Sequence, residues 1–346
     1  MSDDVTPGSN RVVDLINGLL DRGYTQTAEP VLRAIARDTT SGIVQQRLDE
    51  LRDEAQRLQE AGERLRPDNP VLRALIADGE PVFGRAANRM DAVSGDVALN
   101  AADTAGRLQR QLTLPGMTDA RLRAVGIQWN TPDPDAINAL VDYTGRDEWR
   151  ALVGRYPGAI SDTIRSQAIQ GMANGWGPLF TAGRIAETTT GLPRYQADVL
   201  MRTLQLESYR SASALHQTAN ADILEGSIRI GTLDDRICLC CLSLHGSRLR
   251  VGEKVADHHG GRCTSVGVVT GRPLDVLSGD AWFEAQSEPR KRQLMGPANY
   301  EAYRAGRVQL RDFVQDYRDP VFGDMVRQAS LQSVLGSAAK EYYTRR

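Results

Sequence analysis

Apolar residues recur at helical spacing along most of the first 225 positions. The most regular segment, residues 42–66, predicts a long helix with a heptad seam about three repeats long. The seam positions are Val44, Leu48, Leu51, Ala55, Leu58, Gly62 and Leu65. A short seam broken by Ala and Gly is weak support for pairing between chains. We therefore expect an intramolecular bundle, with a partner helix from another chain as the alternative.

Other segments repeat the helical pattern less regularly. Helices are predicted at residues 10–20, 28–35, 133–143, 147–153, 160–172, 181–190 and 195–223. Glycines and prolines interrupt residues 71–125, which predicts linked short helices there. Pro193 lies near the start of the predicted helix at 195–223, which we expect to be separate from the helix at 181–190.

The pattern changes at Gly226, where short alternating runs separated by glycines begin. Strands are predicted near residues 228–230, 248–251 and 266–269, and helical spacing returns at 281–287, 290–295, 300–304, 310–317 and 325–343. The predicted fold class is therefore mainly α with one small β-containing Cys/His unit. We expect a helical N-terminal region (1–195), a region with a long helix and that unit (196–275), and a helical C-terminal region (276–346).

Composition narrows the functional classes. The 42 basic and 44 acidic residues leave a formal charge of −2, which argues against a general electrostatic grip on nucleic acid or an anionic membrane. No window approaches the roughly 18 apolar residues of a membrane-spanning helix. The N-terminus lacks the charged start and apolar core of a secretory signal, so we expect synthesis in a reducing cytosol and no membrane partner.

All four cysteines fall within residues 238–263. In a cytosolic protein such clustering favours metal or redox chemistry over a disulfide framework. Two residues separate Cys238 from Cys241, a spacing that suits one tetrahedral ion, and His258 or His259 with Cys263 would complete a Cys3His set. Zinc suits these ligands, and a closed four-ligand site predicts scaffolding. The alternatives are buried thiols with exposed histidines and no metal, and a redox thiol site.

The same stretch resembles a known signature. Leu-Asp-x-Arg-x-Cys-x-x-Cys (233–241), a glycine at Gly246 and His-x-x-x-Arg-Cys (258–263) are similar to the pattern of the tailed-bacteriophage minor head proteins, the head-morphogenesis family that includes the Mu F-like proteins. That family usually closes with His-x-x-Cys-Arg-Cys, and here Gly261 stands at the first closing cysteine. A looser Arg-Thr-Glu helix (201–208) precedes the signature, and residues 282–314 resemble the segment that follows it.

The resemblance implies a virion structural protein. It would be a minor head component at the portal vertex, acting in head morphogenesis, DNA packaging or genome ejection. Its expected partners are the portal and other head or neck proteins, with several copies assembled in the host cytoplasm and no catalytic step. The implied zinc ligands are Cys238, Cys241, His258 and Cys263. His259 is the substitute ligand, Cys240 a bystander, and Asp234, Arg236 and Arg262 are expected to brace the loop.

Other functions and partners stay open. Asp257-His258-His259 after a Cys-x-x-Cys pair is also typical of HNH-like metal-dependent nucleases, although no histidine follows His259 to supply their further element. A non-viral zinc-stabilised protein-interaction module is the other alternative. The basic residues Arg290-Lys291-Arg292 and Arg345-Arg346 leave non-specific contact with packaged DNA as a further expectation.

Overall fold

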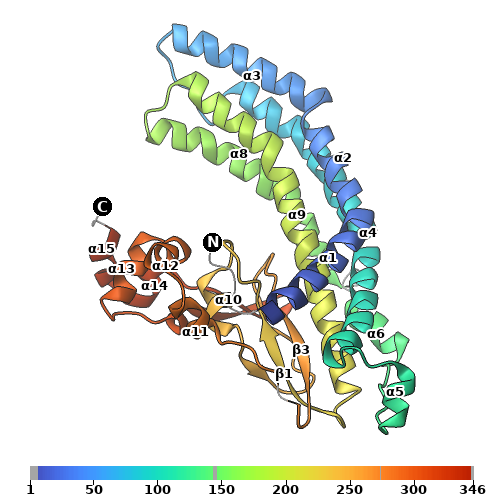
Figure 1. The fold of residues 1–346 in the computed structure, drawn as a ribbon. Helices are drawn as coiled ribbons and strands as arrows, with labels where there is room; N and C mark the ends of the chain where they lie inside the picture. Colours follow the sequence, from blue (N-terminus) through green and yellow to red (C-terminus); the bar gives the residue numbers. More distant parts are fainter. Residues whose placement is uncertain (1–6, 143–145, 273, 344–346) are drawn as a thin grey trace. The chain divides into compact units, whose positions relative to one another are not determined.

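The computed structural model describes residues 7–142, 146–272 and 274–343 (Figure 1). The chain is 65% helix and 8% strand, which confirms the predicted mainly α fold with a small antiparallel sheet. It divides into two compact units. Unit 1 comprises Met1–Arg22, Ala98–Val141 and Gln205–Arg346, and unit 2 comprises Gly23–Val97 and Asp142–Leu204. The sequence boundaries near residues 195 and 275 stay a prediction.

The α-helices have the following bounds: α1 Pro7–Thr27, α2 Glu29–Thr39, α3 Gly42–Glu60, α4 Pro70–Thr113, α5 Asp119–Ala124, α6 Pro134–Val141, α7 Asp147–Gly154, α8 Tyr156–Ala173, α9 Pro178–Thr218, α10 Leu239–Leu244, α11 Gly279–Glu284, α12 Glu288–Met295, α13 Pro297–Arg304, α14 Leu331–Leu335 and α15 Lys340–Tyr343. Two 3-10 turns, η1 Leu310–Phe313 and η2 Gly336–Ala339, lie in the C-terminal part. Among the described residues, no helix is both long and apolar enough to cross a membrane.

Two helices are longer than the sequence predicts. The prediction of linked short helices at residues 71–125 is wrong, because α4 is a continuous helix of 44 residues with Pro81 inside it. The prediction of two separate helices at 181–190 and 195–223 is also wrong, because α9 is a single helix of 41 residues with Pro193 inside it. An interior proline costs about 3 kcal/mol, which packing must offset. At Pro193 the buried Tyr156 hydroxyl of α8 donates to the proline carbonyl at 2.6 Å.

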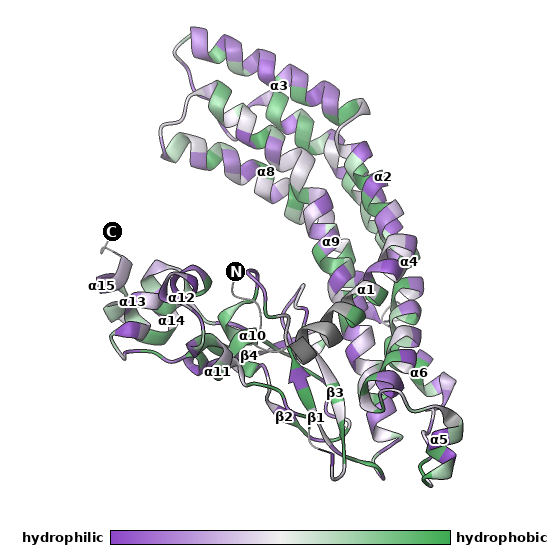
Figure 2. Cartoon of the chain, viewed as in Figure 1, coloured by the Kyte–Doolittle hydropathy of each residue, from purple (hydrophilic) through white to green (hydrophobic). Residues whose placement is uncertain are grey.

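Unit 2 is a helical bundle that contains the heptad seam. Val44, Leu48, Leu51, Ala55 and Leu58 of α3 are buried within this single chain, as predicted for intramolecular packing. Hydrophobic positions recur among the mostly hydrophilic ones of α3 (Figure 2). The helix ends at Glu60, earlier than the predicted residue 66. Gly62 has φ +70°, and the Glu63 N–H then bonds the Leu58 carbonyl at 2.8 Å, which closes the helix.

Unit 1 contains the predicted small sheet. Strands β1 (Leu224–Ile230), β2 (Arg248–Leu249) and β3 (Thr264–Val269) form an antiparallel sheet in the order β2-β1-β3. Ile228 pairs with Val266, and these two residues form a buried cluster with Ile230 and Val268. Between the strands, the chain carries α10 and the loop with the histidines, so the sheet fixes both ends of the cysteine stretch.

The C-terminal part of unit 1 differs from the sequence expectation at one place. Helices predicted across residues 310–317 and 325–343 give way to a hairpin of β4 (Val314–Asp319) and β5 (Gly323–Gln328), followed by short helical pieces. The turn explains the difference, because Asp319 Oδ1 accepts the N–H groups of Val321 and Phe322 at 2.8 and 3.0 Å. Such an aspartate turn favours a hairpin over a helix.

Candidate metal centre

Cys238 and Cys241 lie at the start of α10. Cys238 is the N-cap, and its Sγ accepts a hydrogen bond from the Cys241 N–H at 3.3 Å. This turn brings both Sγ atoms to one side, as the Cys-x-x-Cys spacing predicts. Hydrogen bonds from the Cys240 and Cys241 thiols lower the pKa of Cys238. The lowered pKa favours the thiolate form of Cys238, which is the form that binds metal.

His258 completes a first group with this pair. Its Nε2 lies 3.3 Å from both Cys238 Sγ and Cys241 Sγ. Tetrahedral zinc with bonds of about 2.3 Å to sulfur and 2.0 Å to nitrogen sets those atoms about 3.5 Å apart. On its other side, Nδ1 lies 3.0 Å from the His259 carbonyl oxygen. A proton held there leaves the Nε2 lone pair facing the sulfurs, the arrangement of a metal-binding histidine.

Cys263 precedes β3 and belongs to a second, overlapping group. Cys241, Asp257 and Cys263 place their ligand atoms within 4.8 Å of one another, as do Cys238, Cys241 and His258. All four predicted ligands also line one small cavity of about 60 Å³. The four side chains thus form a Cys/His cluster that could hold a metal ion. The geometry alone does not select the metal.

Cys240, the expected bystander, and His259, the expected substitute ligand, lie outside this cluster. Cys240 is fully buried but belongs to neither metal-compatible group found among the described residues. Its thiol donates to Cys238, which raises the pKa of Cys240. His259 turns away from the sulfurs, since its Nε2 lies 3.0 Å from Asp319 Oδ2 and its ring packs against Phe322.

A buried ionic network behind the cysteines is absent from the sequence prediction. Asp257 is fully buried and accepts hydrogen bonds from Arg210 Nη2 at 2.6 Å and Arg229 Nη2 at 3.4 Å. The backbone N–H groups of His258 and Cys263 also donate to it, each at 3.0 Å. Burial raises the pKa of Asp257, but the two arginines outweigh burial and hold that pKa below its usual range. The Asp257 carboxylate therefore fixes the backbone of two predicted ligands.

Arg210 connects this network to the long helix α9. Its guanidinium donates to Glu207 Oε1 at 2.6 Å, to the Cys263 carbonyl at 2.8 Å and to the Gly261 carbonyl at 2.8 Å. Glu207 in turn accepts from Lys254 at 2.8 Å. The only sequence signal was the pair of opposite charges three residues apart on α9, which alone does not indicate burial.

The glycine at position 261 has a steric explanation. A Cβ atom on Gly261 would lie 2.4 Å from Cγ of Asp257, whose carboxylate is held by the two arginines. Any side chain here would displace Asp257. The glycine at position 261 is thus coupled to the buried ionic network.

The expected bracing of the loop is confirmed. Arg262 makes two hydrogen bonds of 2.7 Å to the two carboxylate oxygens of Asp234, and Arg236 lies 3.7 Å from the same carboxylate. This bidentate pair ties the segment before Cys238 to the segment that ends at Cys263.

The basic run on α12 is surrounded by carboxylates. Arg290 pairs with Asp235, Lys291 with Glu284 at 2.8 Å, and Arg292 with Glu301 at 2.5 Å. Positive charge that is neutralised locally contributes little to phosphate binding. The other basic pair, Arg345-Arg346, lies outside the described residues.

In comparisons with known proteins, no protein-family model, no curated protein and no solved structure matches the chain.

Proposed function

We propose that this chain is a structural component of a tailed-bacteriophage virion, a minor head protein at the portal vertex with a zinc-stabilised unit. One observation carries the proposal. The residues that resemble the phage signature in order, Cys238, Cys241, His258 and Cys263, are also the residues that converge on one small cavity. The segment between positions 241 and 258 separates Cys238 and Cys241 from His258 and Cys263 in the sequence. Because all four residues nevertheless line the same cavity, we infer that they share a role.

Zinc is the ion that the donor set fits best. Three sulfurs and one imidazole nitrogen are borderline-soft ligands, which favour zinc over calcium or magnesium. Three thiolates and Zn²⁺ carry a net charge of −1, and Arg229 Nη2 lies 3.9 Å from Cys241 Sγ to offset it. Bound zinc would supply folding free energy by cross-linking α10, the histidine loop and the start of β3.

A scaffolding role follows from the arrangement of these ligands. Four protein ligands leave no open coordination position, which catalytic zinc sites keep. Asp257 and Arg210 connect the ligand-bearing loops to α9, so the zinc-stabilised part of the chain would be a rigid structural element. We therefore assign the chain no catalytic step. The helical regions would contact the portal and other head or neck proteins, in several copies per virion.

Metal analysis tests the zinc unit directly. The full chain, purified without a metal-binding tag, should contain about one zinc per chain by elemental analysis. Cys238→Ser should lose the zinc and thermal stability together, whereas Cys240→Ser is the matched control and should keep both. Well-folded protein without metal, or equal loss in both variants, would contradict the proposed ligand set.

The virion role needs a separate test. Genes for a portal protein and a terminase beside the gene of this chain, and the chain itself in mass spectra of purified virions, are the expected results. Neighbours of another kind and absence from virions would favour the non-viral interaction module. Plasmid cleavage that depends on a divalent metal and is lost in folded His258→Ala would instead establish the nuclease.

A further inference from the structure

Unit 1 contains a second cavity, which the metal centre does not use. Its volume is about 1060 Å³, and all its lining residues come from α4, α5, α6, the segment between α5 and α6, and His216 of α9. Ordinary small-molecule pockets reach about 1000 Å³. Leu99 is 47% exposed, and the side chains of Asp103 and Arg107 are more than half exposed. The cavity is therefore a large groove that faces solvent.

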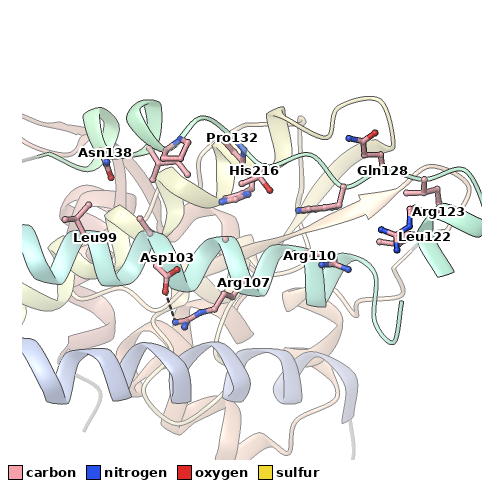
Figure 3. A pocket seen from close by; sticks show the side chains of 17 residues that line it. Leu99, Asp103, Arg107, Arg110, Leu122, Arg123, Gln128, Pro132, Asn138 and His216 are labelled. Carbon is pink, nitrogen blue, oxygen red and sulfur yellow. Dashed lines mark ion pairs between the residues drawn. The ribbon is translucent and has the colours of Figure 1, made fainter. Parts of the chain in front are cut away.

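One face of α4 forms a wall of this groove. Leu99, Asp103, Arg107 and Arg110 follow one another at intervals of four, four and three residues, which places them along one side of the helix. Figure 3 shows three of them, Asp103, Arg107 and Arg110, in a row on the helix that crosses the view. Arg107 pairs with Asp103 at 3.0 Å. This wall has an excess of positive charge.

The lining from α5, α6 and the segment between them contributes apolar side chains. They are Leu122, Ile127, Trp129, Pro132 and Ile137, together with Pro134. Figure 3 shows Pro132 across the groove from α4. Arg123, also in the lining, adds a third arginine, so the groove combines aliphatic contact area with a net positive charge. An apolar surface beside guanidinium groups matches a ligand that is apolar on one side and acidic on the other.

The base of the groove holds a buried polar group. His216 is 4% exposed, and its ring lies against Gly106, where an added Cβ would be 2.9 Å from Nε2. Its Nδ1 has no hydrogen-bond partner among the described residues. Burial lowers the pKa of His216. A buried polar atom without a protein partner is a place where a water molecule or a ligand can donate or accept a hydrogen bond.

We propose that this groove binds an acidic amphipathic peptide segment of a partner protein. Apolar side chains of the segment pack on Leu99, Ile127 and Trp129, while its carboxylates face Arg107 and Arg123. A nucleic acid fits less well. Trp129 and His216 are the only aromatic rings among the described lining residues, so successive bases have little to stack on. The proposal does not depend on the metal centre or on a virion role.

A labelled model peptide tests the groove in the full chain. The probe is a fluorescein-labelled 16-residue helix with leucines on one face and glutamates on the other, measured by fluorescence anisotropy. We expect saturable binding with a Kd in the micromolar range. A scrambled peptide of the same composition should bind about tenfold more weakly, because it cannot present both faces at once.

Matched variants locate the site. The double variant Arg107→Glu with Arg123→Glu should weaken binding about tenfold. Arg272→Glu with Arg311→Glu makes the same change of charge at exposed positions outside the lining, and should change Kd less than twofold. If the first pair perturbs folding, Leu99→Ser removes an exposed apolar contact and should also weaken binding.

Three outcomes would overturn the proposal. The first is no saturable binding of the amphipathic peptide, and the second is equal weakening by the two double variants. The third is tighter binding of a labelled 16-nucleotide oligothymidylate that is lost in the groove variant, which would identify a nucleic-acid site instead.

Discussion

The buried network around Asp257 allows a quantitative prediction. The change Asp257→Asn keeps the shape of the side chain but removes its charge. Arg210 and Asp257 are almost completely buried and lie 2.6 Å apart, and Arg229 approaches the same carboxylate at 3.4 Å. Without that carboxylate, Glu207 remains as the nearest counter-charge of Arg210.

Two estimates give the size of the effect. Unit charges about 4 Å apart interact by about 4 kcal/mol at an effective dielectric constant of about 20. Removing one partner of a buried ion pair typically costs about 3–5 kcal/mol. We therefore expect Asp257→Asn to lower the free energy of opening of unit 1 by about 3–5 kcal/mol. The loss should concentrate around His258 and Cys263, whose N–H groups Asp257 accepts.

Hydrogen–deuterium exchange measures this loss locally. Peptides covering residues 224–270 should exchange much faster in Asp257→Asn, while those covering α3 in unit 2 should not change. The matched control is Asp234→Asn, which breaks the partly exposed pair with Arg262 and should cost about 0–1 kcal/mol. If the two substitutions cost the same, the buried network contributes no more than a surface pair and the reasoning is refuted.

Three further predictions follow from neighbouring features. Burial lowers the pKa of His245 to about 4, below its unfolded value of about 6.5. Because the unfolded chain binds the proton more tightly, the free energy of unfolding is highest above about pH 6.5. It falls as the pH falls, and at pH 5 it is lower by about 2 kcal/mol. Urea titrations should show this slope, and an equally steep slope in His245→Gln would contradict the assignment. Gly261→Ala should cost about 1–3 kcal/mol through collision with Asp257, and unchanged thermal stability would show that the carboxylate moves freely. Chelation of the proposed zinc should speed exchange at residues 238–263 but not in α8, and uniform exchange would exclude local cross-linking.

Regular features of this fold are readable from the sequence. The seam of α3 was predictable because Val44, Leu51 and Leu58 repeat at one spacing and all become buried. The strands were predictable because alternation around Ile228 and Val266 is bounded by glycines. The continuity of α4 and α9 was not predictable, because the sequence pattern around an interior proline is local, whereas the packing that offsets the cost of the proline involves other parts of the chain.

The candidate site divides in the same way. The predicted ligands are cysteines and a histidine, residue types that commonly bind metal. The sequence alone therefore predicted Cys238, Cys241, His258 and Cys263 as ligands. Asp257 and Arg210 are ordinary charged residues in sequence. Their role depends on burial and on contacts across 47 positions, which no local pattern records.

The division of the chain also constrains how the protein can be made. Unit 1 needs three separate segments, the first ending at Arg22 and the last beginning at Gln205. At translation rates of about 5–20 residues per second, the first segment waits roughly 10–40 s for the last one to begin emerging from the ribosome. Unit 2 is complete once Leu204 has emerged and can fold first. The cysteines are therefore among the later residues to be synthesised, and they can enter a metal site only at the end of a folding order that chain connectivity imposes.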